Sequence, residues 1–108
     1  MTIQLHEMLS NAARDVLAER QRQIDVEGWS REHDDECHVW GELAQAAAAY
    51  ALNALGGPLA KYLAEKAWPF EPLSFKPKNP RADLVRAAAM IIAQIEVFDR
   101  LAEKGLMT

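Results

Sequence analysis

The chain has 108 residues, half of them hydrophobic, which suits a single domain covering residues 1–108 with a packed core. Its formal net charge of −4 at pH 7 argues against sequence-independent binding to duplex nucleic acid, although a local basic pocket for a nucleotide is compatible with it. The single cysteine, Cys37, cannot form an intramolecular disulfide, and neither a signal peptide nor a membrane-spanning stretch is apparent, so we expect a cytoplasmic protein without membrane partners.

The first predicted helix begins after Ser10, whose hydroxyl is a suitable N-cap for a helix that starts at Asn11. Apolar residues then recur at helical spacing, at positions 13, 16, 17 and 24. Gly28 is expected to end this helix, because glycine readily adopts the left-handed backbone that often follows a helix. A polar connection covers residues 28–35.

A second helix is expected from Glu36 to Leu55, with Asp34 or Asp35 as its N-cap. Its sequence AQAAAAYAL is rich in alanine, the best helix former, and small side chains let another helix approach closely. This helix is therefore predicted to be central. The sequence GGP at residues 56–58 is expected to end it.

A short third helix is predicted from Leu59 to Ala67. An ordered but irregular segment follows, because four of the five prolines lie at positions 69, 72, 77 and 80. Asn79 is the expected N-cap of the last helix, and Pro80 occupies its first position, where proline is favoured. Residues spaced at i, i+3, i+4 and i+7 predict a broad apolar side for this helix: Leu84, Ala88, Ile91, Ile92, Ile95, Phe98 and Leu101.

Together these patterns predict an all-α fold, a small helical bundle of three longer helices and one short helix. The apolar side of the last helix is broad for a chain of 108 residues. We therefore expect part of that side to be buried against a second copy of the chain, in a homodimer or a higher homo-oligomer.

Acidic residues are concentrated before and at the start of the second predicted helix. Seven of the sixteen acidic residues lie between Asp25 and Glu42, where their repulsion must be relieved by water or by a cation. Mg²⁺ takes oxygen ligands and leaves positions for phosphates, so Asp34, Asp35 and Glu42 are candidate ligands. The alternative is that Asp34 and Asp35 cap the helix while the other acids are solvated surface.

A second group of charges lies in the first turns of the last helix. Arg81 and Arg86 suit phosphate binding, because a guanidinium offers paired donors to phosphate oxygens. Asp83 is a further candidate metal ligand. The alternative is an ordinary charged start of a surface helix.

The proline-rich segment combines aromatic rings with lysines. Trp68 and Phe75 are candidates for stacking on a nucleobase, and Lys76 and Lys78 are candidates for binding phosphates. The alternative is that Trp68 and Phe70 close the end of the bundle as a hydrophobic plug. The sequence contains no Gly-rich phosphate loop, no Ser–His–Asp signature and no dinucleotide-binding fingerprint.

Several segments, in the order EGW, EHDD, GELA, KP and DLV, resemble small proteins that are widespread in phages and prophages. These proteins are similar to the all-α MazG-like nucleoside triphosphate pyrophosphohydrolase superfamily, and the resemblance covers about residues 14–100. It implies a four-helix unit that pairs with a second copy and hydrolyses (d)NTPs to the monophosphate and pyrophosphate. It also implies four carboxylates that bind Mg²⁺, or Mn²⁺ in its place, which neutralises phosphate charge and activates water.

The resemblance transfers only part of that carboxylate set to this sequence. Glu42 matches one ligand, but Gln45 stands where a second acid is expected. Asp83 matches the first acid of the later pair, but Arg86 stands where its aspartate is expected. Four acids outside the matched positions are candidates to compensate: Glu19, Glu27, Asp34 and Asp35.

Three functions are compatible with these observations. The first is a Mg²⁺-dependent nucleotide pyrophosphohydrolase, in which Glu42 and Asp34 take part in catalysis and His33 positions water or a phosphate. The second is a catalytically inactive protein that binds or sequesters a nucleotide on the same scaffold. The third is a module that binds a protein partner through Trp29, Trp40 or the aromatic segment.

Overall fold

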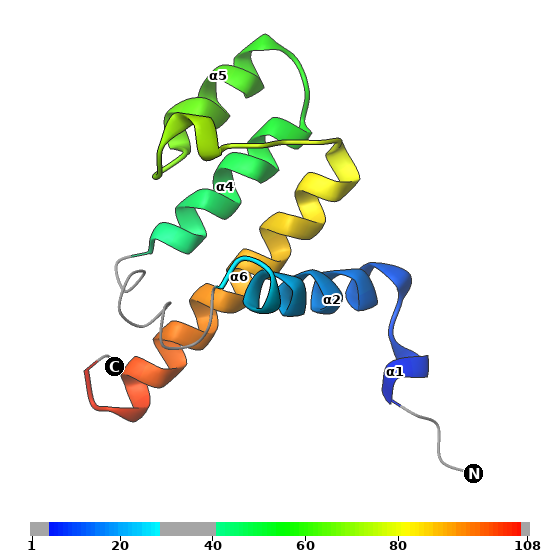
Figure 1. The fold of residues 1–108 in the computed structure, drawn as a ribbon, viewed down its shortest axis with the longest axis vertical. Helices are drawn as coiled ribbons and strands as arrows, with labels where there is room; N and C mark the ends of the chain where they lie inside the picture. Colours follow the sequence, from blue (N-terminus) through cyan, green and yellow to red (C-terminus); the bar gives the residue numbers. More distant parts are fainter. Residues whose placement is uncertain (1–4, 29–40, 107–108) are drawn as a thin grey trace.

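The computed structural model describes residues 5–28 and 41–106, which form an all-α fold without strands, as predicted (Figure 1). The longer helices are α2 (Asn11–Asp25), α4 (Glu42–Ala54) and α6 (Pro80–Glu103), and α5 (Pro58–Ala67) is shorter. A single helical turn, α1 (Leu5–Met8), and a short 3₁₀-helix, η1 (Pro72–Ser74), complete the elements and were not predicted from the sequence.

The predicted caps of α2 and α6 are confirmed. The Ser10 hydroxyl accepts a hydrogen bond from the Ala13 N–H at 3.1 Å, and the Asn79 side-chain oxygen accepts one from the Ala82 N–H at 2.9 Å. Pro80 is the first residue of α6. Each cap satisfies one of the N–H groups that a helix leaves without an intrahelical partner.

The start of the predicted second helix is wrong. Gly41 has a φ of 95°, which is incompatible with a continuous helix, and α4 begins only at Glu42. Residues 36–40 of the prediction lie outside the described residues. No side chain caps α4 locally, but the side-chain Oε1 of Gln94 on α6 accepts a hydrogen bond from the Ala44 N–H at 3.1 Å. A neighbouring helix therefore supplies the acceptor that the local sequence lacks.

The pair α4–α6 is the centre of the fold, with α5 packed on α4 and α2 packed on α6 (Figure 1). The prediction that the alanine-rich helix is central is thus confirmed. Its buried side meets α6 in a cluster made of Ala46, Ala47, Tyr50, Ala87 and Met90. A second cluster lies farther along the same helix pair and contains Leu43, Ala93 and Val97.

The apolar side predicted for α6 is only partly buried within the described chain. Leu84, Ile91 and Ile95 are 51%, 46% and 52% exposed. The residues that α6 buries are instead Asp83, Ala87, Ala89, Met90, Ala93, Gln94 and Val97. Small side chains favour this other face because they let α4 come close. The association of a second copy along the exposed residues stays a prediction.

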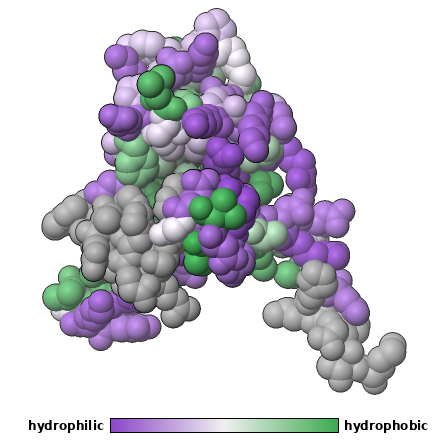
Figure 2. All heavy atoms as spheres, viewed as in Figure 1, coloured by the Kyte–Doolittle hydropathy of each residue, from purple (hydrophilic) through white to green (hydrophobic). Residues whose placement is uncertain are grey.

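Exposed apolar side chains also occur on other elements, and on the face shown in Figure 2 they form separate patches among hydrophilic residues. None of the described helices is long and apolar enough to cross a membrane.

The α6 core predicts a clear difference between two valine substitutions. Val97→Ala removes two buried methyl groups from a fully buried position and should lower the free energy of unfolding by about 2 kcal/mol. Val26→Ala makes the same chemical change at a residue that is 72% exposed, and should have an effect within about 0.5 kcal/mol. Urea denaturation of both variants measures the difference, and equal effects would contradict this packing.

Candidate functional site

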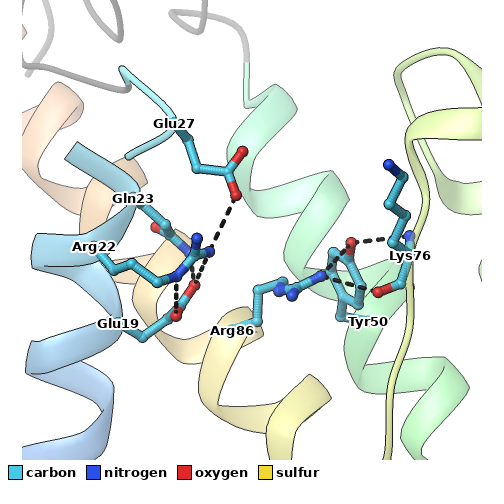
Figure 3. A network of polar contacts seen from close by, with 7 residues as sticks. All are labelled: Glu19, Arg22, Gln23, Glu27, Tyr50, Lys76 and Arg86. Atoms are coloured by element: carbon cyan, nitrogen blue, oxygen red, sulfur yellow. Dashed lines mark hydrogen bonds and ion pairs between the residues drawn. The ribbon is translucent and has the colours of Figure 1, made fainter. Parts of the chain in front are cut away.

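A pocket of about 550 Å³ lies between α2, α4, α6 and the segment of residues 68–78. Its two opposite sides are visible in Figure 3, with Arg22 and Glu27 on one and Arg86, Tyr50 and Lys76 on the other. Cationic and aromatic side chains dominate the lining, which consists of Arg22, Gln23, Glu27, Leu43, Tyr50, Trp68, Phe70, Ser74, Lys76, Lys78, Arg86 and Met90.

On the α2 side, two carboxylates orient the Arg22 guanidinium. Its Nε and Nη2 atoms donate to the two Glu19 oxygens at 2.7 and 2.8 Å, and Nη2 also donates to Glu27 at 3.1 Å. The hydrogen bonds that Arg22 donates, above all those to Glu19, raise the pKa of Arg22 above its ordinary range. The hydrogen bond with Arg22 in turn lowers the pKa of Glu19. Both groups therefore stay ionised at neutral pH, and the guanidinium is held at the edge of the pocket.

On the opposite side, Arg86 is held by the segment and by α4. Its Nη1 donates to the Tyr50 hydroxyl at 2.9 Å and to the Lys76 carbonyl at 3.0 Å. The same hydroxyl accepts a weaker hydrogen bond from the Lys76 N–H at 3.3 Å. The guanidinium carbon lies 4.9 Å from the centre of the Tyr50 ring, a cation–π distance. Arg86 thus reaches the pocket with a defined orientation.

Asp83 anchors the end of the same segment. Its side chain is buried, and one carboxylate oxygen accepts a hydrogen bond from the Lys78 N–H at 2.8 Å. Asp83 does not line the pocket, and neither does Glu42, the first residue of α4. Within residues 5–28 and 41–106 no group of three or more His, Cys, Asp or Glu side chains is arranged to hold a metal ion. His33, Asp34 and Asp35 lie outside the described residues, so the predicted metal set stays a prediction.

Arg81 occupies a different surface from the other predicted phosphate-binding residues. Its guanidinium donates to Asp15 of α2 at 2.8 Å, with both side chains at least half exposed. Arg81 does not line the pocket, whereas Lys76, Lys78 and Arg86 do. The structure therefore brings together three of the four cations that the sequence analysis selected.

The aromatic residues of the segment pack on one another and on Tyr50. The Trp68 ring lies 5.3 Å from Tyr50, 5.3 Å from Phe70 and 5.1 Å from Phe75, measured between ring centres. Its indole N–H donates to the Glu71 carbonyl and to the Ser74 hydroxyl, both at 3.0 Å. Trp68 and Phe70 line the pocket, while Phe75 faces a second cavity of about 400 Å³. The rings thus form both a plug and one apolar wall.

The sequence analysis missed six lining residues: Arg22, Gln23 and Tyr50, and also Leu43, Ser74 and Met90. Arg22 and Gln23 lie outside the apolar spacing of the first predicted helix, and only the tertiary arrangement brings them to the pocket. Tyr50 carried a usable signal, because it is the one aromatic side chain in the alanine-rich sequence AQAAAAYAL.

Comparison of the chain with protein-family models found no match, and comparisons with curated proteins and with solved structures found none. The resemblance to MazG-like proteins and the activity it implies therefore stay predictions from the sequence.

The contact between Glu19 and Arg22 predicts a loss of stability in acid. Since the pKa of Glu19 is lowered from the ordinary 4.5 by folding, the unfolded chain binds this proton more tightly than the folded protein. The ionised Glu19 therefore stabilises the folded protein fully above pH 4.5. This stabilisation is lost as the pH falls through the pKa of Glu19 in the folded state. Glu19→Gln should thus be less stable than wild type at pH 7 by about 1 kcal/mol, with a smaller difference at pH 3.

Thermal and urea denaturation across this pH range measure the effect. Glu103→Gln is the matched control, because it neutralises an exposed carboxylate at the end of α6. If the difference in free energy of unfolding between Glu19→Gln and wild type does not change with pH, folding does not lower the pKa of Glu19.

Proposed function

We propose that this protein binds a nucleotide in the pocket between α2, α4, α6 and residues 68–78. The observation that carries the proposal is the lining: Arg22, Lys76, Lys78 and Arg86 share one cavity with the rings of Tyr50, Trp68 and Phe70. Guanidinium and ammonium groups neutralise phosphates, and aromatic walls attract a base with little regard to its identity. A volume of about 550 Å³ is in the range of pockets for small organic ligands.

The charges suggest how such a ligand would lie. Arg22 is already engaged by Glu19 and Glu27, whereas no ion pair joins Lys76, Lys78 or Arg86 to an acid among the described residues. Phosphates therefore gain more from the side formed by Lys76, Lys78 and Arg86. The adjoining Trp68 and Phe70 then offer the apolar surface for the base.

Binding is better supported than hydrolysis. In the described part of the pocket the only acidic lining residue is Glu27, and its carboxylate contacts Arg22. Arg86, which stands where the resemblance calls for an aspartate ligand, is used to hold the Tyr50 hydroxyl and the Lys76 carbonyl. Mg²⁺-dependent pyrophosphohydrolysis is the second candidate. The sequence resemblance favours it, and Asp34 and Asp35 are the acids it would need in addition.

The test is a set of thermal melts against (d)NTPs, (d)NMPs, cyclic nucleotides and ADP-ribose-type nucleotides, with and without Mg²⁺, with pyrophosphate measured in parallel. A ligand that binds the folded state raises the melting temperature by mass action, so a shift without pyrophosphate supports a binding protein. A shift with Mg²⁺-dependent pyrophosphate release supports the hydrolase. The absence of a shift with every nucleotide would overturn the proposal and turn attention to protein partners.

Two arginines near the start of α6 should behave differently in this assay. Arg86→Ala removes a guanidinium from the pocket and should weaken the affinity for the best nucleotide by about 10- to 100-fold, the usual range for hydrogen bonds to charged groups. Arg81→Ala, the matched control, removes the same group outside the pocket and should change the affinity less than about twofold. Isothermal titration calorimetry measures both. Equal losses would place the binding site elsewhere.

A further inference from the structure

We propose that Tyr50 is the positioning residue of the phosphate-binding side of the pocket, acting through Arg86 and the backbone of Lys76. This inference rests on the proposed function, and it concerns a residue that the sequence analysis did not select. In Figure 3 the Tyr50 hydroxyl lies at the point where the Arg86 side chain and the Lys76 backbone meet.

The Tyr50 ring is fixed before any ligand arrives. The residue is 2% exposed, and its ring centre lies 5.3 Å from that of Trp68 and 5.0 Å from that of Phe75. Ring packing of this kind leaves the hydroxyl little freedom to move. The side chain comes from α4, which packs directly on α6, so its position is set by the centre of the fold.

The hydroxyl joins two parts of the phosphate-binding side. A tyrosine hydroxyl has two acceptor positions, and here it accepts from the Arg86 guanidinium and from the Lys76 N–H. Arg86 also donates to the Lys76 carbonyl. The N–H and C=O of Lys76 are therefore both held, one by α4 and the other by α6.

The segment is held a second time two residues later. The buried Asp83 carboxylate accepts the hydrogen bond of the Lys78 N–H, and Pro77 between the two lysines has a fixed φ. The backbone from Lys76 to Lys78 is thus anchored at both ends. Arg86 then faces the pocket in a fixed orientation and both lysines extend from an anchored backbone, so less ordering is left to oppose binding of a phosphate.

Tyr50→Phe tests this inference because it keeps the ring packed and removes only the hydroxyl. The probe is inorganic pyrophosphate, titrated by calorimetry into folded wild-type protein and variants. We expect Tyr50→Phe to weaken pyrophosphate binding by about tenfold. Tyr62→Phe is the matched control, since it removes a hydroxyl from a half-exposed tyrosine on α5, outside the pocket, and should leave the affinity unchanged.

A double-mutant cycle separates positioning from a general loss of stability. If Tyr50 acts through Arg86, Tyr50→Phe should have a much smaller effect on pyrophosphate affinity in an Arg86→Ala background than in wild type. Additive losses would overturn the inference. So would wild-type affinity in Tyr50→Phe, and that result would leave the proposed function intact.

Amide hydrogen exchange provides a measurement that needs no variant. Lys76 is an exposed residue, yet its N–H is hydrogen-bonded to Tyr50 and should exchange more slowly than an unbonded amide. An unprotected Lys76 amide would overturn the inference. Failure of the wild-type protein to bind either pyrophosphate or any nucleotide would instead overturn the proposed function, and the inference with it.

Discussion

The close contact between α4 and α6 is the constraint on which the rest of the structure depends. Alanines line both sides of this contact, among them Ala46 and Ala47 on α4 and Ala87 on α6. Because their side chains are small, the two backbones come near enough for Gln94 of α6 to cap α4 and for Arg86 of α6 to reach Tyr50 of α4. A larger residue in the contact between α4 and α6 would push the two helices apart. The side chains on these helices that line the pocket would then also move apart.

The pocket joins two sides with different electrostatic character. On α2, Arg22 lies between Glu19 and Glu27, so positive and negative charges largely compensate each other. Around the proline-rich segment, Lys76 and Lys78 flank the pocket with Arg86, and neutral or buried groups fix their backbone. In the proposed complex the phosphates would lie on the side of Lys76, Lys78 and Arg86, next to the aromatic wall that would hold the base.

Asp83 and Arg86, which occupy two of the positions where the predicted resemblance calls for metal ligands, have other contacts here. Asp83 holds the Lys78 N–H from a buried position, and Arg86 holds Tyr50 and the Lys76 carbonyl. Both contacts order the segment that carries the lysines. Arg86, which occupies the position where the predicted resemblance calls for an aspartate, therefore helps to order the segment that carries the lysines.

The sequence by itself determined the elements whose signals are local. Ser10 and Asn79 cap their helices through their own side chains, Pro80 starts α6, and the alanine run specifies a central helix. Tertiary structure decided what depends on contacts between distant residues. It chose the alanine face of α6 over the aliphatic one, paired Arg81 with Asp15, and brought Arg22 and Tyr50 to the pocket. These outcomes follow from how closely helices can pack, and helical periodicity alone does not encode that distance.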